Sequence, residues 1–305
     1  MNQYQKYKIV TVLLGLLWIA PVNGQGKQQL VNLNNSSLSE RWLIKNDTAK
    51  TFKILPYKPV YLLVLNYIDD INNSPQSGNP LNTVTTPTEF NNAEFTFQLS
   101  FKTRVLRINK NKKQKIDLWV AYTQLSKWQL YNGLISRPFR ETNYEPEALI
   151  VFPVDYKIFG LEGVYLAGGY NHQSNGRSNP YSRSWNRIMF QAGWQAKNWS
   201  IVLNPWIRIQ EDSIEDNNPD IENYIGRAEL LTAFSKNKHN VSLAFRHSLN
   251  TGNNNRGSLR LHYGFQIVDN LHLHLQVFHG YGENLIDYNH KQTTFGLGFS
   301  LIRWR

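Results

Sequence analysis

Alternation of apolar and polar residues recurs along this chain and constrains its fold more than any other feature. In Phe95, Phe97, Leu99 and Phe101, for example, every second residue is apolar. Because successive side chains of a strand point to opposite faces, this period of two predicts strands with one apolar and one polar face. The pattern repeats, between turn-rich stretches, at residues 95–102, 116–123, 200–210, 241–246, 271–278 and 295–301.

The N-terminus has the organisation of a secretory signal peptide. An apolar stretch at residues 9–20 follows two lysines, and Gly24 lies at the expected cleavage position. The stretch is too short for a bilayer-spanning helix, which takes about 20 residues. We therefore predict a signal peptide at residues 1–24, a polar N-terminal segment at 25–57 and a transmembrane β-barrel domain at 58–305.

The alternation alone fits both a soluble β-sandwich and a membrane barrel. A secretory signal followed by strands as far as the last residues favours the barrel, and closure removes the sheet edges that lipid does not tolerate. The remaining length holds about twelve membrane strands of ~10 residues with their connections. The predicted fold class is an all-β, antiparallel transmembrane barrel of about 12 strands.

Composition excludes several classes of site. The chain has no cysteine, so it forms no disulfide, thiolate zinc site, cysteine nucleophile or acylated lipoprotein N-terminus. The net charge of +11 is spread out, and its densest cluster, at residues 110–115, lies between two strand patterns as a solvated turn would. For a secreted chain, this charge favours anionic lipid headgroups over nucleic acid as partners.

His172 and Ser174 are the strongest candidates for chemistry. Their spacing places both side chains on one face of a strand, about 7 Å apart. A histidine beside a serine hydroxyl is the base and nucleophile pair of acyl transfer, and Asn186, on the neighbouring strand after a tight turn, would orient the imidazole. These residues continue the more apolar face of their strands, which upstream carries Val164 and Leu166 and which on a membrane barrel meets lipid. A nucleophile there indicates a lipid substrate.

The sequence around these residues resembles the bacterial outer-membrane phospholipase A family, whose members carry Tyr-x-His-x-Ser-Asn-Gly and a downstream Ser-Arg-Ser-Trp-Asn-Arg. The resemblance covers most of the chain after about Phe95, and its motifs occur in the family order. The matching segments here are 122–124, 136–146, 170–178, 182–187, 218–221 and 280–289.

The resemblance implies a function and roles for particular residues. The protein would be a calcium-dependent phospholipase A of the outer membrane, hydrolysing sn-1 and sn-2 acyl esters of phospholipids and lysophospholipids. Ser174, His172 and Asn186 would form the catalytic triad, and the Gly176 amide would donate to the oxyanion. Ca²⁺ would bind the Arg177 carbonyl, the Ser182 hydroxyl and, from the other subunit of a homodimer, the Ser136 carbonyl.

Two further expectations concern the dimer and a second metal site. Gln124 lies on the apolar parity, where an amide lacks water and either reaches the headgroup zone or pairs with a partner; the resemblance implies a glutamine pair across the homodimer. Relatives can carry a second, acid-lined calcium site, but Asn179 and Asn217 occupy its expected positions here. We therefore do not expect the second calcium site here, although the adjacent Asp216 could substitute for one of its acids.

Other chemistry in the chain has simpler interpretations. His272 and His274 alternate on the polar parity and indicate lumen lining rather than a metal pair. Glu141, Glu145 and Asp287 are expected in lumen or turn networks. The alternatives to a phospholipase are a passive porin or adhesin barrel, and a barrel deacylase of another lipid that would lack the calcium pattern.

Overall fold

The computed structural model describes residues 36–44, 50–108 and 115–302 of the 305-residue chain. The predicted signal peptide at residues 1–24 lies outside these described residues, and its boundary stays a prediction. Among the described residues, no helix is long and apolar enough to cross a membrane.

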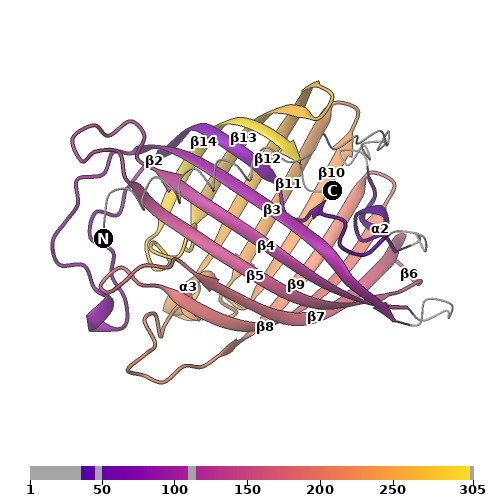
Figure 1. The fold of residues 1–305 in the computed structure, drawn as a ribbon, viewed down its shortest axis with the longest axis horizontal. Helices are drawn as coiled ribbons and strands as arrows, with labels where there is room; N and C mark the ends of the chain where they lie inside the picture. The colour runs from indigo at the N-terminus through magenta and orange to yellow at the C-terminus, as the bar shows by residue number, and fades with distance from the viewer. Residues whose placement is uncertain (1–35, 45–49, 109–114, 303–305) are drawn as a thin grey trace, which may run out of the picture. The chain divides into compact units, whose positions relative to one another are not determined.

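Twelve long antiparallel strands pair in a closed ring, which confirms the predicted fold class (Figure 1). Each of these strands pairs with the strands before and after it in the chain, and the last pairs with the first to close the ring. The strands are β2 (Val60–Ile68), β3 (Ala93–Ile108), β4 (Ile116–Trp128), β5 (Phe139–Pro153), β7 (Leu161–Ser174), β8 (Ser184–Ala196), β9 (Trp199–Ile209), β10 (Ala228–Lys236), β11 (His239–His247), β12 (Gly257–Val268), β13 (Leu271–Gly280) and β14 (Gln292–Ile302).

The remaining elements of the described residues are short. Two-residue strands β1 (Leu55–Pro56) and β6 (Lys157–Ile158) pair with β3 and β7. Helix α2 (Leu38–Arg41) precedes the barrel, and α3 (Glu222–Ile225) lies in the connection between β9 and β10. Single 3₁₀ turns occur at η2 (Pro80–Asn82) and η3 (Gly252–Asn254).

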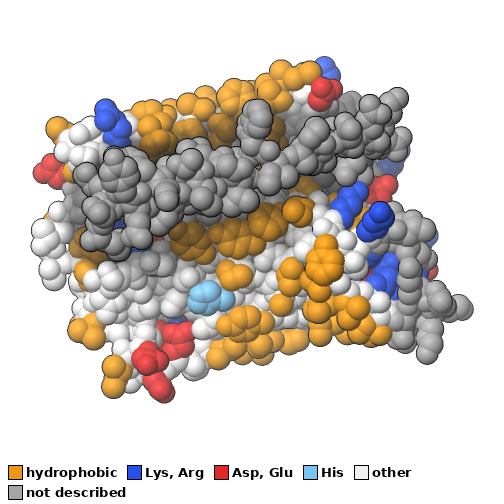
Figure 2. All heavy atoms as spheres, viewed as in Figure 1, with side chains coloured by type: hydrophobic (Ala, Val, Ile, Leu, Met, Phe, Trp, Pro, Cys, Tyr) orange, Lys and Arg blue, Asp and Glu red, His pale blue; other side chains and the backbone are white. Residues whose placement is uncertain are grey.

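The outer face of the barrel is apolar and its inner face is polar, which is the reverse of a soluble protein. On β14, Phe295 and Leu297 are 52% and 46% exposed, whereas Thr294 and Ser300 are buried in the lumen. Figure 2 shows hydrophobic side chains across the visible strands and charged ones near the two ends. An apolar exterior around a polar interior is the pattern of a membrane barrel, in which lipid is the outer solvent.

One residue departs from the predicted alternation. The sequence pattern placed Val164 on the lipid-facing side with Leu166, but Val164 is buried in an internal apolar cluster, so that prediction is wrong. The register between β7 and β8 shifts between Gly163 and Tyr165, and such a bulge reverses the side-chain alternation locally.

Paired charges occupy the lumen. The Lys127 ammonium lies 2.8 Å from the Glu283 carboxylate, and Arg140 bridges Glu94 and Asp287. A buried charge is tolerated when it is paired and hydrogen-bonded, as these are. Glu141, Glu145 and Asp287 all take part in such internal networks, as predicted.

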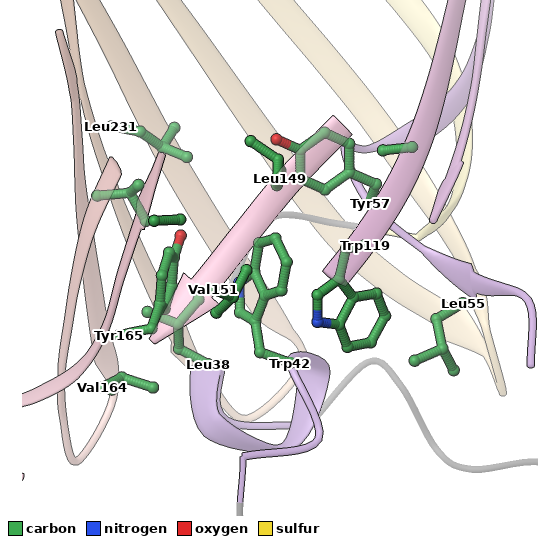
Figure 3. Packing of buried hydrophobic residues seen from close by; sticks show 13 residues of the cluster. Leu38, Trp42, Leu55, Tyr57, Trp119, Leu149, Val151, Val164, Tyr165 and Leu231 are labelled. Atoms are coloured by element: carbon green, nitrogen blue, oxygen red, sulfur yellow. The ribbon is translucent and has the colours of Figure 1, made fainter. Parts of the chain in front are cut away.

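The described part of the predicted polar N-terminal segment packs against the barrel interior. Ser37 caps α2, accepting from the Glu40 amide while Glu40 accepts from the Ser37 amide. Trp42, from the turn after α2, contacts Trp119 and Tyr165 edge-on or tilted, as Figure 3 shows. The segment is therefore not polar throughout, because it also supplies Leu38, Trp42, Leu55 and Tyr57 to the buried cluster.

Candidate active site on the lipid-facing surface

The candidate triad lies at the end of one hairpin. His172 and Ser174 are the last alternate residues of β7, and Asn186 is the third residue of β8. The register places His172 directly opposite Asn186, and Ser174 opposite Ser184. The neighbouring-strand placement of Asn186 is as predicted. The connection is not a tight turn, however, but a loop at residues 175–183 that carries its own hydrogen bonds.

A hydrogen bond joins the imidazole to the amide. The His172 Nδ1–H donates to Asn186 Oδ1 over 2.8 Å. Because the amide oxygen only accepts, this contact assigns the proton to Nδ1 and leaves Nε2 with a free lone pair. An imidazole in that tautomer is ready to take a proton at Nε2, as a general base does.

The structure brings together His172 and Asn186 but forms no Ser174–His172 hydrogen bond. Among the described residues, none is hydrogen-bonded to the Ser174 hydroxyl. Ser174 lies two residues along the same strand from His172 and is half-buried. Ser174 and His172 thus lie on one face of β7. Hydrogen bonds between a nucleophile and its base are often long without substrate and shorten when substrate binds.

The surroundings of the triad are apolar and outward-facing. Tyr170 and Ile188 are 44% and 38% exposed on the same parity of β7 and β8 as the candidate residues. This is the face that carries the apolar residues of the barrel exterior. The candidate site therefore opens onto lipid rather than into the lumen, as the sequence predicted.

Gly176 follows the serine in a conformation that suits a glycine. Its φ is +64°, and a Cβ there would lie 3.2 Å from the Tyr144 ring. In the part of the chain that the structure describes, the Gly176 N–H has no hydrogen-bond partner. A free, exposed backbone donor two residues after Ser174 has the character needed to bind a developing oxyanion.

Two buried side chains hold the loop at residues 175–183. Asn175 Oδ1 accepts from the Arg183 amide, and Asn175 Nδ2 donates to the Tyr181 carbonyl. The fully buried Arg183 guanidinium donates to four carbonyls, of Gln76, Asn82, Pro180 and Ser182. Arg183 was not predicted as a site residue, although it stands in the Ser-Arg-Ser-Trp-Asn-Arg motif.

The oxygens expected at a calcium site fit a hard cation. Ser182 Oγ accepts one hydrogen bond, from Asn217 Nδ2 at 3.0 Å, and retains a lone pair. Among described residues, no group donates to the carbonyls of Arg177 or Ser136. Ca²⁺ prefers such oxygen ligands, so these residues suit it. Ser136 is exposed in the separate loop between β4 and β5, and no described hydrogen bond links it to the loop at 175–183.

The residues at the expected position of a second calcium site are hydrogen-bonded to other protein groups. Asn179 Oδ1 accepts from Asn82 Nδ2 at 2.9 Å, and Asn217 Oδ1 accepts from the Ser184 amide at 2.8 Å. Asp216 is paired with Arg208 instead. Within the described residues, no group of three or more His, Asp or Glu side chains is arranged to hold a metal.

Gln124 has partners on its own strand. Its Oε1 accepts from the Tyr122 hydroxyl and its Nε2 donates to Ser126 Oγ, both over 3.1 Å. The amide is therefore not unpaired in the single chain. His272 and His274 are buried in the lumen, as predicted, and His274 is hydrogen-bonded to His262.

Two residues around Asn186 were also missed. The Tyr170 hydroxyl donates to Asn186 Oδ1, and Asn186 Nδ2 donates to Glu211 Oε1. Tyr170 stands in the recognised motif, so its position carried a usable signal. Glu211 follows β9 in an acidic loop that matches no motif, so only the structure reveals it.

The sequence of the chain matches one family of known proteins. The sequence profile of the family described as phospholipase A1 matches residues 38–301. A putative phospholipase A1 of Neisseria meningitidis is 38% identical over 84% of this chain and 67% of its own length. Phospholipase A1 of Escherichia coli is 41% identical over 60% of this chain, and the match spans 62% of that relative.

Solved structures share the fold. The calcium-bound outer membrane phospholipase dimer of Salmonella typhi aligns with a TM-score of 0.75 and 33% identity, over 85% of this chain and 97% of that one. Outer membrane phospholipase A of Escherichia coli aligns with a TM-score of 0.71 and 33% identity, over 82% of this chain and 94% of that one.

Fold and site together define an outer-membrane β-barrel that carries a histidine–asparagine pair on its lipid-facing surface. The chain belongs to the phospholipase A1 family.

Proposed function

We propose that this protein is a calcium-dependent phospholipase that cleaves the sn-1 and sn-2 acyl esters of phospholipids and lysophospholipids. The observation that carries the proposal is the 2.8 Å hydrogen bond from His172 to Asn186, on the lipid-facing surface and two residues from Ser174. The family membership supports the same chemistry.

In the proposed reaction, Ser174 Oγ attacks the acyl carbonyl while His172 Nε2 takes its proton. The imidazolium then protonates the leaving glycerol oxygen, which frees the lysolipid and leaves an acyl ester on Ser174. Water attacks this ester with His172 again as base, and the fatty acid leaves. Asn186 keeps the imidazole in the required tautomer throughout.

Donors and a cation would stabilise the tetrahedral oxyanion. The Gly176 N–H is free to donate to it in the described structure, and its position after Ser174 suits that role. Arg177, Ser182 and the Ser136 of a second copy would hold Ca²⁺, which when bound supplies positive charge beside the oxyanion. None of these ligands is a carboxylate, so we expect modest calcium affinity that depends on dimerisation.

The active form would be a homodimer. The related Salmonella typhi phospholipase was solved as a dimer with calcium, which supports this state. Gln124 would lie in the interface, exchanging its hydrogen bonds with Tyr122 and Ser126 for contacts with the second copy. Since an intact outer leaflet offers little phospholipid, the enzyme would remain monomeric until the bilayer is disturbed.

Refolded protein tests the proposal directly. We would supply phosphatidylcholine with two distinguishable acyl chains, with calcium or with EDTA, to the parent protein and to Ser174→Ala. We expect calcium-dependent fatty-acid release that Ser174→Ala abolishes, with heat-modifiable folding unchanged in the variant. The released chain also identifies the bond that is cut.

The same assay separates the alternatives. A folded barrel that releases no fatty acid in either condition would be a passive barrel. Release that persists in EDTA would indicate a deacylase without the calcium site. Release that survives Ser174→Ala would remove the assigned nucleophile.

A further inference from the structure

A carboxylate from a separate element contacts the side chain that orients the candidate catalytic base. Glu211 follows the end of β9, and its Oε1 accepts from Asn186 Nδ2 over 2.8 Å. Asn186 in turn accepts from His172 Nδ1 and from the Tyr170 hydroxyl. The described contacts thus form a chain from imidazole through amide to carboxylate, with Glu211 half-buried.

This chain determines which end of the amide faces the histidine. An asparagine amide can rotate to present either its oxygen or its NH₂ group, but an ionised carboxylate only accepts hydrogen bonds. With Nδ2 bound to Glu211, Oδ1 must face His172 and Tyr170, which both donate to it. The oxygen then requires the proton on Nδ1, so the free lone pair remains on Nε2.

The carboxylate also supplies a charge that asparagine lacks. When His172 takes the serine proton it becomes an imidazolium, and a neutral amide cannot compensate that charge. Glu211 lies one amide group further away, close enough for attraction beside a poorly hydrated lipid surface. Of the described residues, the titratable groups in this hydrogen-bonded chain are His172, Tyr170 and Glu211.

We propose that Glu211 is a positioning residue for the base of the proposed reaction: it locks the Asn186 amide towards His172 and favours the imidazolium through that amide. The inference rests on the proposed phospholipase function and deepens it. Glu211 acts through its contact with Asn186 and has no direct contact with substrate in the proposed reaction.

The test compares Glu211→Gln, Glu211→Asp and the control Asp212→Asn in the fatty-acid release assay across pH. Glu211→Gln removes the charge and offers an amide that can bind in either orientation. We expect kcat to fall roughly 10-fold with little change in KM, because the substitution disturbs the base rather than the substrate contacts. Heat-modifiable migration would verify folding of each variant.

The pH profile separates this role from a purely structural one. Loss of the nearby negative charge disfavours the imidazolium that forms when His172 accepts a proton, so the acidic limb of kcat/KM should move to lower pH in Glu211→Gln. Glu211→Asp keeps the charge and should leave that limb near its original position. Asp212 is exposed, and its described contacts are made by its backbone carbonyl, so Asp212→Asn should match the parent.

The outcomes distinguish the two proposals. If the parent is active but Glu211→Gln retains its kcat and acidic limb, the role of Glu211 is refuted and the phospholipase function stands. A lower kcat with an unmoved limb would also refute it, since only loop structure would have changed. A folded parent that releases no fatty acid would overturn both proposals.

Discussion

Arg183 should determine how firmly the loop after Ser174 is held. Its buried guanidinium donates to carbonyls of Pro180 and Ser182 within its own loop, and of Gln76 and Asn82 in the connection between β2 and β3. We would replace it by lysine, which keeps the charge. The single ammonium of lysine cannot reproduce the planar fork that reaches both segments.

The expected magnitude follows from the four hydrogen bonds. If lysine leaves two of these carbonyls without a donor, at about 1.5 kcal/mol or more for each bond to a charged group, local stability falls by about 3 kcal/mol. Because 1.4 kcal/mol corresponds to a factor of ten, local opening becomes roughly 100-fold more frequent.

Hydrogen exchange measures this opening directly. The Asn175 amide, which donates to the Arg183 carbonyl, and the Arg183 amide, which donates to Asn175 Oδ1, are the reporters. We expect both to exchange faster in Arg183→Lys, while amides within the barrel strands keep their rates. Arg227→Lys, the same change at a partly exposed arginine, is the control.

An unchanged rate for the two reporters would refute the reasoning, because it would mean that the four contacts do not limit loop opening. Equal acceleration throughout the barrel would refute it in another way, since Arg183 would then stabilise the whole fold rather than this loop.

Three further predictions concern the interface, the metal and the outer loops. Gln124→Leu should weaken dimerisation about 3- to 10-fold, which is the effect of losing one polar contact between membrane-spanning segments. Sedimentation in detergent with calcium would measure the association, and an unchanged dimerisation constant would contradict the prediction. Ser182→Ala should raise the calcium concentration needed for half-maximal activity, whereas Ser178→Ala in the same loop should not; equal responses would remove Ser182 from the ligand set. Burial opposes ionisation of Asp287, but the Arg140 guanidinium and the Asn284 amide hold the pKa of this carboxyl below its usual range. The ionised Asp287 therefore stabilises the fold at pH values above its unfolded pKa of about 3.9, and this stabilisation is lost as pH falls through the lower native pKa. The protection of backbone amides at residues 281–291 against hydrogen exchange should therefore fall on acidification below about pH 4 in the parent. The fall should be smaller in Asp287→Asn, and an equal fall in both would contradict the role of the ion pair.

The barrel was predictable because its signal is local. Alternation along one strand reports directly on which side faces lipid, and Phe295 and Leu297 are exposed as their parity predicts. The exception, Val164, follows from a register shift between Gly163 and Tyr165. That shift depends on pairing with β8, which the sequence of β7 alone does not reveal.

The site was predictable where a motif spans one hairpin. His172, Ser174 and Asn186 lie close in sequence, and the register brings His172 and Asn186 together as expected. Glu211 and the Arg183 contacts to Gln76 and Asn82 join separate segments, so local patterns do not show them. The same is true of Trp42, whose partners Trp119 and Tyr165 are distant in the chain.

Covalent labelling would show whether Ser174 is the proposed nucleophile. Refolded protein would be treated with a fluorophosphonate that reacts with activated serines, with calcium or with EDTA, and the modified residue located by peptide mass spectrometry. We expect one adduct, on Ser174, that forms with calcium and is lost in His172→Ala. A folded barrel without an adduct, or with an adduct on another serine, would show that Ser174 is not the nucleophile.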